Sequence, residues 1–340
     1  MSIDEAKARS ANIFDVARLA GVSHQTVSRV VNDLPNVRPA TRKRVEDAIR
    51  QLRYRPSTAA RALVTKRSRT IGLITTGNPD YGPSNIVFGF NEAARNERYT
   101  VSISSMLETD DRSIRSAVEL LLGQNAEAIV LIAAHRAALE KMQGIELGVP
   151  LIAVESSGRS GFHSVSIDQF HGAYIATNHL IGLGHEAIVH VAGPLDSMDA
   201  IERVSGWRAA LAEHGIVPRE VLVGDWTPRS GYECGAAIAA DPSITAVFAG
   251  SDQMAIGIIR ALAERGIRVP GDVSVVGFDD IPEAEFISPP LTTVRQDFSQ
   301  LGRDIMATLV AVLRDEVPDS AVHTPPRLIV RDSTVGPARP

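Results

Sequence analysis

Residues 13–32 read IFDVARLAGVSHQTVSRVVN and carry the sharpest local signal in this chain of 340 residues. The pattern over residues 15–20 predicts one short helix. Gly21 follows where the chain must turn sharply, a conformation that glycine adopts without a Cβ clash. Ser23 can then cap a second helix, because its side-chain oxygen can accept a hydrogen bond from a free backbone N–H group. The segment is therefore interpreted as a helix-turn-helix.

A third helix is predicted to begin at Pro39, because proline suits the first helical position, where its missing N–H group is not needed. Apolar residues on its inner face would pack this helix against the first two. Residues 12–55 are thus predicted to form an all-α head. A disordered N-terminus is expected before it, over residues 1–11.

The exposed positions of the second helix carry hydrogen-bond donors and acceptors of the kind that bind base edges and phosphates. His24 and Gln25 open this helix and are the predicted base readers, while Arg29, one turn further on, can reach a base or a phosphate. A generic helical hairpin with a polar outer face is the alternative. The predicted DNA contacts of the head are Ser23, His24, Gln25, Thr26, Ser28, Arg29 and Asn32.

Charge is distributed unevenly along the chain. Residues 1–69 hold 15 Lys and Arg against 6 Asp and Glu, whereas the remainder holds 20 against 34, so that the whole chain has a net charge of -5. A basic head on an acidic body indicates that only the head meets a polyanion such as nucleic acid. A solvated basic tail is the alternative.

Residues 56–69 are predicted to form a hinge helix and a linker. Pro56 interrupts the preceding helix, Ser57 can cap a new one, and the sequence STAARAL has the composition of one or two helical turns. An isolated helix of that length is not stable in water. We therefore expect it to fold only against a surface such as DNA and a symmetry mate.

The composition excludes several classes of protein. Cys234 is the one cysteine, which excludes an internal disulfide framework and a multi-cysteine zinc site and fits a reducing compartment. The first ten residues lack the apolar core of a signal peptide, and no stretch approaches the roughly 18 apolar residues that a membrane span needs. We expect a cytoplasmic protein with no membrane partner, no cofactor and no metal site.

From residue 70 onward, short β-rich apolar runs such as TIGLITT and VSVVGFDD alternate with helical stretches. Such alternation produces parallel sheets covered by helices on both faces. The segment is too long for one such layer, so residues 70–335 are predicted to form two similar α/β lobes. The expected bounds are about 70–165 and 297–325 for the first lobe and about 166–292 and 326–335 for the second, with the crossover near 160–168.

Ligands of open α/β lobes sit at the carboxyl ends of the strands, where three side chains are candidates. Asp279 ends the run VVGFD, and one carboxylate can accept two adjacent sugar hydroxyls. Arg203 follows the loop GPLDSMDA and can donate in a fork, and Trp226, which ends VGDW, offers a flat face to a pyranose. We expect Trp207 to lie in the core and Asp252 to be the N-cap of its helix.

These residues closely resemble the lactose/galactose repressor family. The resemblance runs from VARLAGVSHQTVSRVVN through AGPLDSM, SGW, GDW, SDQMAIG and VSVVGFDD to PPLTTVRQDF, over roughly residues 12–333. It implies a two-lobed body like that of periplasmic binding proteins, and a homodimer whose heads read the half-sites of a pseudopalindromic operator. It also implies that the hinge helix enters the minor groove, where Leu63 would act as a wedge between base steps.

The resemblance also assigns ligand contacts in the body. It implies that Arg203, Trp226, Asp279 and Gln296 contact an inducer sugar, and that Thr76, Pro83, Ile86, Phe298 and Leu301 line the pocket. Three further pocket positions depart from the family member that the head most resembles: Ser251 stands for an asparagine, Glu155 for an aspartate and Asp80 for a leucine. These departures leave the sugar open, with a galactoside-like inducer as the first expectation.

Enzymatic patterns are weak. HEAIVH, from His185 to His190, has one residue too many for HExxH and straddles the start of a strand, and no Walker loop or GxSxG elbow is present. We therefore expect a repressor of carbohydrate utilisation genes that is controlled by a sugar-like effector and is not an enzyme. The alternatives are a solute-binding protein of a sugar transporter and a regulator that uses a non-sugar corepressor.

Overall fold

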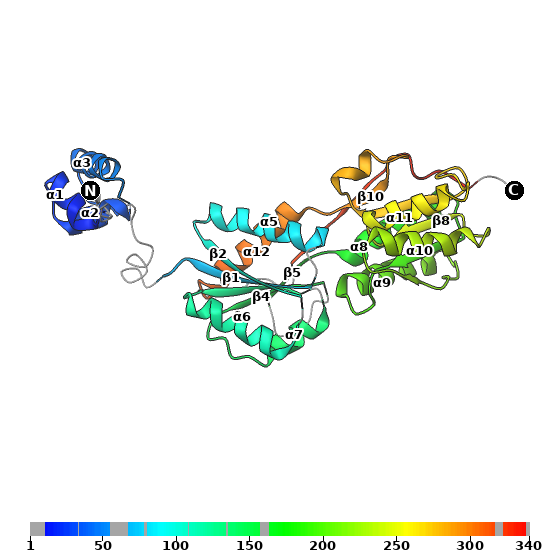
Figure 1. Cartoon of the computed structure of the whole chain (residues 1–340), viewed down its shortest axis with the longest axis horizontal. Helices are drawn as coiled ribbons and strands as arrows, with labels where there is room; N and C mark the ends of the chain where they lie inside the picture. The colour runs from blue at the N-terminus through cyan, green and yellow to red at the C-terminus, as the bar shows by residue number, and fades with distance from the viewer. Residues whose placement is uncertain are drawn as a thin grey trace, which may run out of the picture. The chain divides into compact units, whose positions relative to one another are not determined.

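A computed structural model of the chain describes residues 11–32, 34–54, 67–77, 80–107, 109–133, 135–156, 163–316 and 322–337. Its contacts divide the chain into two compact units, Met1–Ser68 and Arg69–Pro340, which we call the head and the body. Figure 1 shows both units. In the described ranges, no helix is long and apolar enough to cross a membrane.

The head contains the expected helix-turn-helix and third helix. The first helix begins earlier than the expected residue 15, because Asn12 and Asp15 form a reciprocal capping box at its start. Gly21 ends it with φ of 65°, and the Ser23 hydroxyl caps the second helix by accepting from the backbone N–H of Thr26. The helices are α1 (Ile13–Ala20), α2 (His24–Val31) and α3 (Pro39–Gln51).

One residue from each helix forms the centre of the head's core. Val16, Val27 and Val45 have no exposed surface, and small or β-branched residues surround them. A core of this size orders three short helices that would be marginal alone. The N-terminal residues 1–10 and the segment 55–66, which includes the expected DNA contacts Ser57 and Leu63, lie outside the described residues.

The first lobe of the body contains a fully parallel six-stranded sheet in the order β11-β5-β4-β3-β1-β2. Strand β1 lies between β2 and β3 and places Leu73 opposite Ile103 of β2 and Val130 of β3. Helices α5 and α12 cover one face and α6 and α7 the other (Figure 1). The elements are β1 (Thr70–Thr76), α5 (Tyr81–Asn96), β2 (Thr100–Met106), α6 (Asp111–Gly123), β3 (Ala128–Ile132), α7 (Arg136–Gln143), β4 (Leu151–Val154), β5 (His163–Ile167), α12 (Phe298–Val312) and β11 (Val322–Thr324).

The second lobe repeats this plan with the strand order β12-β10-β9-β8-β6-β7. Strand β12 is antiparallel to β10, whereas the other pairs are parallel. Helices α8 and α9 pack on one face, and α10 and α11 on the other. The elements are α8 (Gln169–Gly182), β6 (Ile188–Ala192), α9 (Met198–Glu213), β7 (Leu222–Val223), α10 (Pro228–Ala239), β8 (Ala246–Ala249), α11 (Asp252–Ala263), β9 (Ser274–Asp279), the 3-10 helix η1 (Pro282–Glu285), β10 (Thr292–Arg295) and β12 (Arg327–Ile329).

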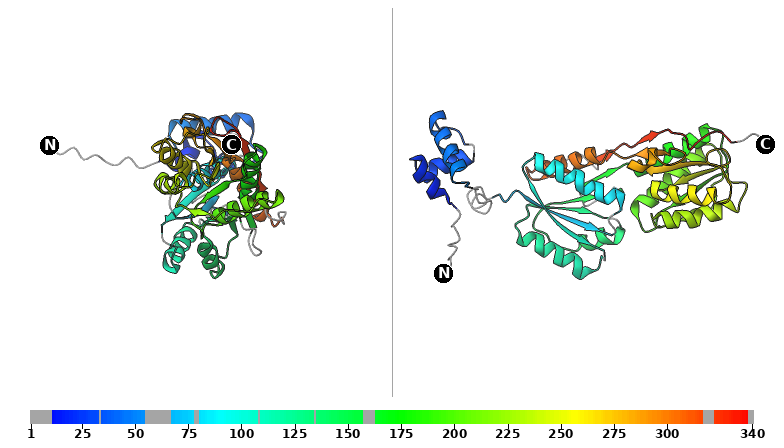
Figure 2. Two further views of the ribbon diagram at one scale, coloured as in Figure 1. Left: turned by 90° about the vertical axis from the view of Figure 1, so that its right-hand side faces the viewer. Right: turned by 45° about the horizontal axis from the view of Figure 1, so that its top comes forward.

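The chain crosses between the lobes three times: between β5 and α8, between β10 and α12, and between β11 and β12 (Figure 2). Two helices of the first lobe were not predicted from the sequence. Helix α7 has only eight residues, and α12 follows directly after a strand that belongs to the other lobe. The apolar residues of α12 do recur at helical spacing, with Leu301, Ile305 and Leu309 all buried.

His190 lies inside the second lobe as a fully buried group of β6. Its ring is parallel to that of Phe248 at a centroid distance of 4.5 Å, and its Nδ1 lies 2.9 Å from the Phe248 carbonyl oxygen. The pKa of His190 is lowered to about 3, mainly by burial and to a smaller extent by the charges of Arg203 and Arg208, against the opposing effect of that hydrogen bond. The ring is therefore neutral in the folded body at all but strongly acidic pH.

We expect the free energy of unfolding to fall as pH is lowered from 6.5 toward 3, because the unfolded chain then binds a proton at His190 that the folded chain refuses. Between pH 7 and pH 4.5 this group alone should remove about 2–3 kcal/mol. His190→Gln replaces the imidazole N–H donor with an amide N–H donor that does not titrate. The free energy of urea unfolding of this variant should therefore depend less on pH. Parallel profiles for the two proteins would contradict a neutral His190.

Candidate functional site

The outer face of α2 presents the residues predicted to meet DNA. His24, Gln25 and Arg29 are exposed, while Thr26, Ser28 and Asn32 are partly buried. Asn32 donates from Nδ2 to the carbonyl oxygen of Ser28 at 2.9 Å and so helps to close the C-terminal end of the helix. The face is polar throughout, and the caps hold its two ends in place.

Phe14 was not singled out from the sequence, although the structure places it beside this face. Its side chain is 59% exposed, and its ring lies 5.2 Å from that of His24. An exposed aromatic ring of this kind can fix the orientation of the imidazole or contact a backbone sugar. The signal was an apolar residue near the start of α1 that is not needed for the core.

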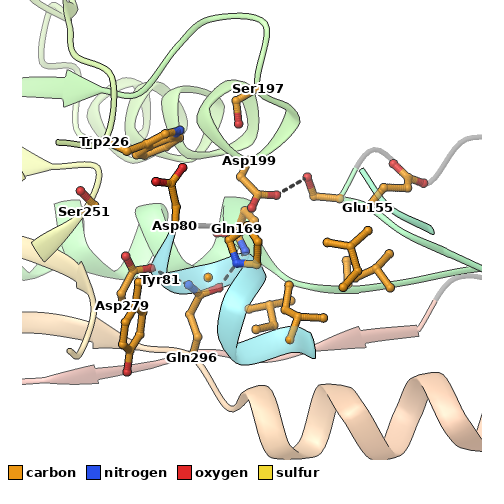
Figure 3. Close-up of a pocket in the computed structure, with 18 of the residues that line it drawn as sticks. Asp80, Tyr81, Glu155, Gln169, Ser197, Asp199, Trp226, Ser251, Asp279 and Gln296 are labelled. Atoms are coloured by element: carbon orange, nitrogen blue, oxygen red, sulfur yellow. Dashed lines mark hydrogen bonds between the residues drawn. The ribbon is translucent and has the colours of Figure 1, made fainter. Parts of the chain in front are cut away.

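The body contains a cavity of about 230 Å³ whose walls come from both lobes (Figure 3). Many of its residues lie just after the carboxyl ends of strands, as expected for open α/β lobes. The walls consist of Asp80, Tyr81, Gly82, Pro83, Ile86, Ile132, Ala133, His135, Val154, Glu155, Ser156, Ser166, Ile167, Gln169, Pro194, Ser197, Asp199, Arg203, Asp225, Trp226, Ser251, Gln253, Asp279, Gln296, Phe298 and Leu301.

Eleven of the twelve residues predicted to contact a ligand are found in these walls. Thr76 is the exception, since it is only 1% exposed at the end of β1 and its hydroxyl lies 3.5 Å from the carbonyl oxygen of Ile132. Thr76 is therefore a buried residue of the first lobe that is not among the residues lining the cavity.

A continuous chain of hydrogen bonds joins four buried polar side chains of the cavity. Arg203 donates from Nε to Oε1 of Gln169 at 2.9 Å, and Gln169 donates from Nε2 to Oε1 of Gln296 at 2.9 Å. Gln296 in turn donates from Nε2 to Oδ1 of Asp279 at 2.6 Å. Gln169 is the first residue of α8 and Gln296 precedes α12, so this chain of bonds links two of the three lobe crossings to Arg203 and Asp279.

The guanidinium of Arg203 is fixed on several sides. It is only 5% exposed, its carbon Cζ lies 3.8 Å from the ring centre of Phe278 and 5.2 Å from that of Trp226, and Nη1 donates to the carbonyl oxygen of Gly250. Its Nη2 lies 3.8 Å from Oδ1 of Asp279. A fork held in this way is pre-organised for a ligand, because little side-chain entropy is left to lose on binding.

The pKa of Asp279 is raised to about 6, mainly by burial and to a smaller extent by the carboxylates of Asp199 and Asp80. Arg203 and the hydrogen bond from Gln296 act in the opposite direction. Asp279 is therefore largely ionised at neutral pH but easily protonated below it. Both protein contacts fall on Oδ1, so within the described part of the chain Oδ2 is left for a ligand.

The backbone is strained at two places where the second lobe contributes side chains to the cavity walls. Trp226 has φ of 71°, Asp279 has φ of 116° and Asp280 has φ of 53°, values that side chains other than glycine rarely adopt. Asp280 is held by Arg331 at 2.7 Å and by Arg295, so it supports the turn and does not line the cavity. Strained residues of this kind cluster at ligand sites.

Asp252 is not the N-cap of α11, which corrects the expectation from the sequence. Ser251 caps the helix by accepting from the backbone N–H of Met254 at 3.2 Å. The fully buried carboxylate of Asp252 instead accepts from the N–H of Ile281 at 2.9 Å and from the hydroxyl of Thr293. It thereby fixes the turn that carries Asp279, and burial raises the pKa of Asp252 well above its usual range.

Several polar residues of the cavity walls were not predicted from the sequence, among them Tyr81, Gln169 and Asp199. Gln169 lies two residues after the end of β5 and could have been found by the same strand-end argument that found Asp279. Asp199 belongs to the stretch PLDSMDA that led to Arg203 and lies in the first turn of α9, one helical turn before Arg203. Tyr81 opens α5, and its ring lies 5.9 Å from that of Phe298.

The patterns that suggested catalysis lie in structural positions. His185 precedes β6 and bonds Thr245 and the carbonyl oxygen of Val335, both at distances below 3 Å. Cys234 is half-buried in α10, where burial raises the pKa of its thiol and so disfavours the reactive thiolate. Among the described residues, no group of three or more His, Cys, Asp or Glu side chains could hold a metal ion.

Two family models match the chain. "Bacterial regulatory proteins, lacI family" matches residues 12–57, and "Periplasmic binding protein-like domain" matches residues 177–334. The lactose operon repressor of Escherichia coli (strain K12) is 33% identical over 96% of this chain and 91% of its own length. Catabolite control protein A of Priestia megaterium is 34% identical over 95% of this chain and 98% of its own.

Solved structures give the same picture over both units. The lac repressor dimer bound to operator and the anti-inducer ONPF aligns with a TM-score of 0.86 at 32% identity, covering 96% of this chain and all of that one. The complex of the transcriptional regulator CelR with cellobiose aligns with a TM-score of 0.71 at 32% identity, covering 95% and 99% of the two chains.

Proposed function

The chain belongs to the lacI family of bacterial regulatory proteins and is a DNA-binding transcriptional repressor controlled by an effector, and we propose that this effector is a sugar-like inducer that binds in the cavity of the body. The regulated genes then serve carbohydrate utilisation. We further propose that the protein acts in the cytoplasm as a homodimer on a pseudopalindromic operator, so that two heads meet two half-sites.

The observation that carries the sugar proposal is the arrangement of Trp226, Arg203 and Asp279 on one cavity. A flat aromatic ring, a fork of donors and a carboxylate acceptor are the groups that a pyranose with hydroxyls around its rim requires. The relatives include a regulator solved with cellobiose. A galactoside is our first choice among sugars, although Asp80, Glu155 and Ser251 give these walls a polarity of their own.

For the head, we propose that His24 and Gln25 read bases in the major groove and that Ser23, Thr26, Ser28, Arg29 and Asn32 contribute further DNA contacts. All of them lie on α2 or next to its ends, and four of them are exposed: Ser23, His24, Gln25 and Arg29. The roles of Ser57 as a hinge cap and Leu63 as a minor-groove wedge stay predictions from the family resemblance.

The sign of the switch follows from which state the effector prefers, because coupling between two sites is reciprocal. We propose that the ligand favours the state that releases DNA. A corepressor would instead favour the bound state.

Fluorescence anisotropy with a lac-like pseudopalindromic duplex tests this function, with a scrambled duplex of the same composition as the control. We expect tight binding to the pseudopalindrome alone and release by one member of a panel of galactosides and other sugars. Equal binding to both duplexes would contradict a sequence-specific regulator. Tighter operator binding in the presence of the ligand would overturn the inducer assignment.

A further inference from the structure

The walls of the cavity are strongly acidic. Besides Glu155, four aspartates line it, whereas Arg203 is the one Arg or Lys that the described walls contain. His135 is near Asp196, with Nδ1 and Oδ2 3.4 Å apart. The four aspartates come from both lobes: Asp80, Asp199, Asp225 and Asp279.

Asp80 differs from the usual aspartate at a helix start. It occupies the N-cap position of α5, where an aspartate usually accepts a backbone N–H, yet its side chain makes no capping hydrogen bond. The carboxylate neither accepts a hydrogen bond nor forms an ion pair with any residue that the structure describes. It is half-buried and lies below the indole of Trp226, between Asp279 and Asp199 (Figure 3).

The carboxylates act on one another electrostatically. Burial raises the pKa of Asp80, and the charge of Asp225 from the other lobe raises it further, against a smaller opposing effect of His135. The charges of Asp199 and Asp80 in turn raise the pKa of Asp279. Like charges gathered in a partly desolvated cavity destabilise it unless an opposite charge enters.

Among the residues that the structure describes, no Arg or Lys side chain pairs with Asp80. Arg203 uses Nε for Gln169 and Nη1 for Gly250, and its Nη2 faces Asp279, so its charge is committed to the opposite wall. An anionic ligand such as a sugar phosphate would meet at least three carboxylates and one engaged guanidinium. A neutral sugar would leave the Asp80 charge uncompensated.

We propose that the effector is a saccharide or polyol that carries a protonated amine, whose ammonium group binds Asp80 and the neighbouring Asp199 and Asp279 while its hydroxyls bind Arg203 and Gln296. This inference rests on the proposed function, since it names the ligand class of the same cavity. The ammonium supplies donors to an unpaired carboxylate and the positive charge that the walls lack.

Isothermal titration calorimetry of the full-length protein tests the inference with matched probes: galactosamine, galactose and galactose 6-phosphate, and the same three forms of glucose. We expect one amine to bind at least about tenfold more tightly than its neutral partner, because of the charge pair with Asp80. The phosphates should not bind measurably. Tighter binding of a neutral or phosphorylated probe, or no binding of either amine at millimolar concentration, would overturn the inference.

Two variants locate the effect. Asp80→Asn should weaken amine binding about tenfold and leave the affinity for the neutral partner within about threefold. Glu92→Gln, which removes an equal charge from the solvent-exposed side of the same helix α5, should change neither. An amine preference that survives Asp80→Asn would also overturn the proposal. Operator binding is measured separately, so loss of operator recognition would count against the proposed function, whereas the calorimetric preference judges the ligand class alone.

Discussion

Arg203→Ala should abolish the response of operator binding to the effector while the ligand-free protein still binds its operator. The guanidinium is the one strong donor group of the described cavity walls, and it also holds Gln169 and thereby Gln296 and Asp279 in place. Its removal eliminates ligand contacts and also frees the remaining polar side chains to change position. Operator anisotropy with and without the inducing ligand measures the effect.

The same substitution should destabilise the body by about 3–5 kcal/mol, because it leaves the buried carboxylate of Asp279 without its positive partner. Arg203→Lys should recover part of that stability, since it keeps the charge, but not the response, since an ammonium cannot reproduce the fork. Arg208→Ala, on the exposed side of the same helix, is the control and should change neither property. An Arg203→Ala variant that responds at normal ligand concentration would remove Arg203 from the effector site.

Local rules were sufficient for the head. The turn at Gly21, the cap at Ser23 and the start of α3 at Pro39 each follow from the stereochemistry of one residue, and all three stand in the structure as expected. The start of α1 shows the limit of such rules: the capping box formed by Asn12 and Asp15 moves the first turn two residues earlier.

The cavity required more than local rules. Strand-end logic and the family resemblance found Arg203, Trp226 and Asp279, but the choice between Ser251 and Asp252 as the cap of α11 could not be made from adjacent residues of similar capping ability. It is decided by Thr293, which is far away in sequence and offers its hydroxyl to Asp252. Thr76 is not found among the wall residues, and its hydroxyl donates to the carbonyl oxygen of Ile132, a partner that its place at a strand end does not predict.

Asp80 is a further residue for which sequence and structure contribute different information. The sequence shows only that an aspartate stands where the related protein has a leucine. A carboxylate in place of a leucine predicted a change in ligand, but an aspartate before a helix also predicts a cap. The structure separates the two, because Asp80 leaves its helix uncapped and faces the cavity (Figure 3). A polar residue that does not perform its usual local task is thus a better indicator of function than its type alone.

Gly193→Ala should weaken effector binding by about 30- to 150-fold, which corresponds to the loss of about 2–3 kcal/mol of apolar contact with the indole. A Cβ at this position would lie 2.1 Å from Cζ2 of Trp226. Non-bonded carbon atoms cannot approach so closely, so the indole ring must move. Trp226 sits on a strained backbone with φ of 71°, and Gly250 confines the same ring from another side, which leaves few positions for it to move to.

Calorimetric titration of the effector into Gly193→Ala measures the loss, and the fluorescence of the indole reports whether the ring has moved. Gly82→Ala is the matched control, because Gly82 also lines the cavity but an added Cβ would meet nothing within 4 Å. Affinity should therefore survive at Gly82 and fail at Gly193, although both substitutions add one methyl group. If Gly193→Ala bound the effector as tightly as Gly82→Ala does, Trp226 would not be the surface on which the ligand stacks.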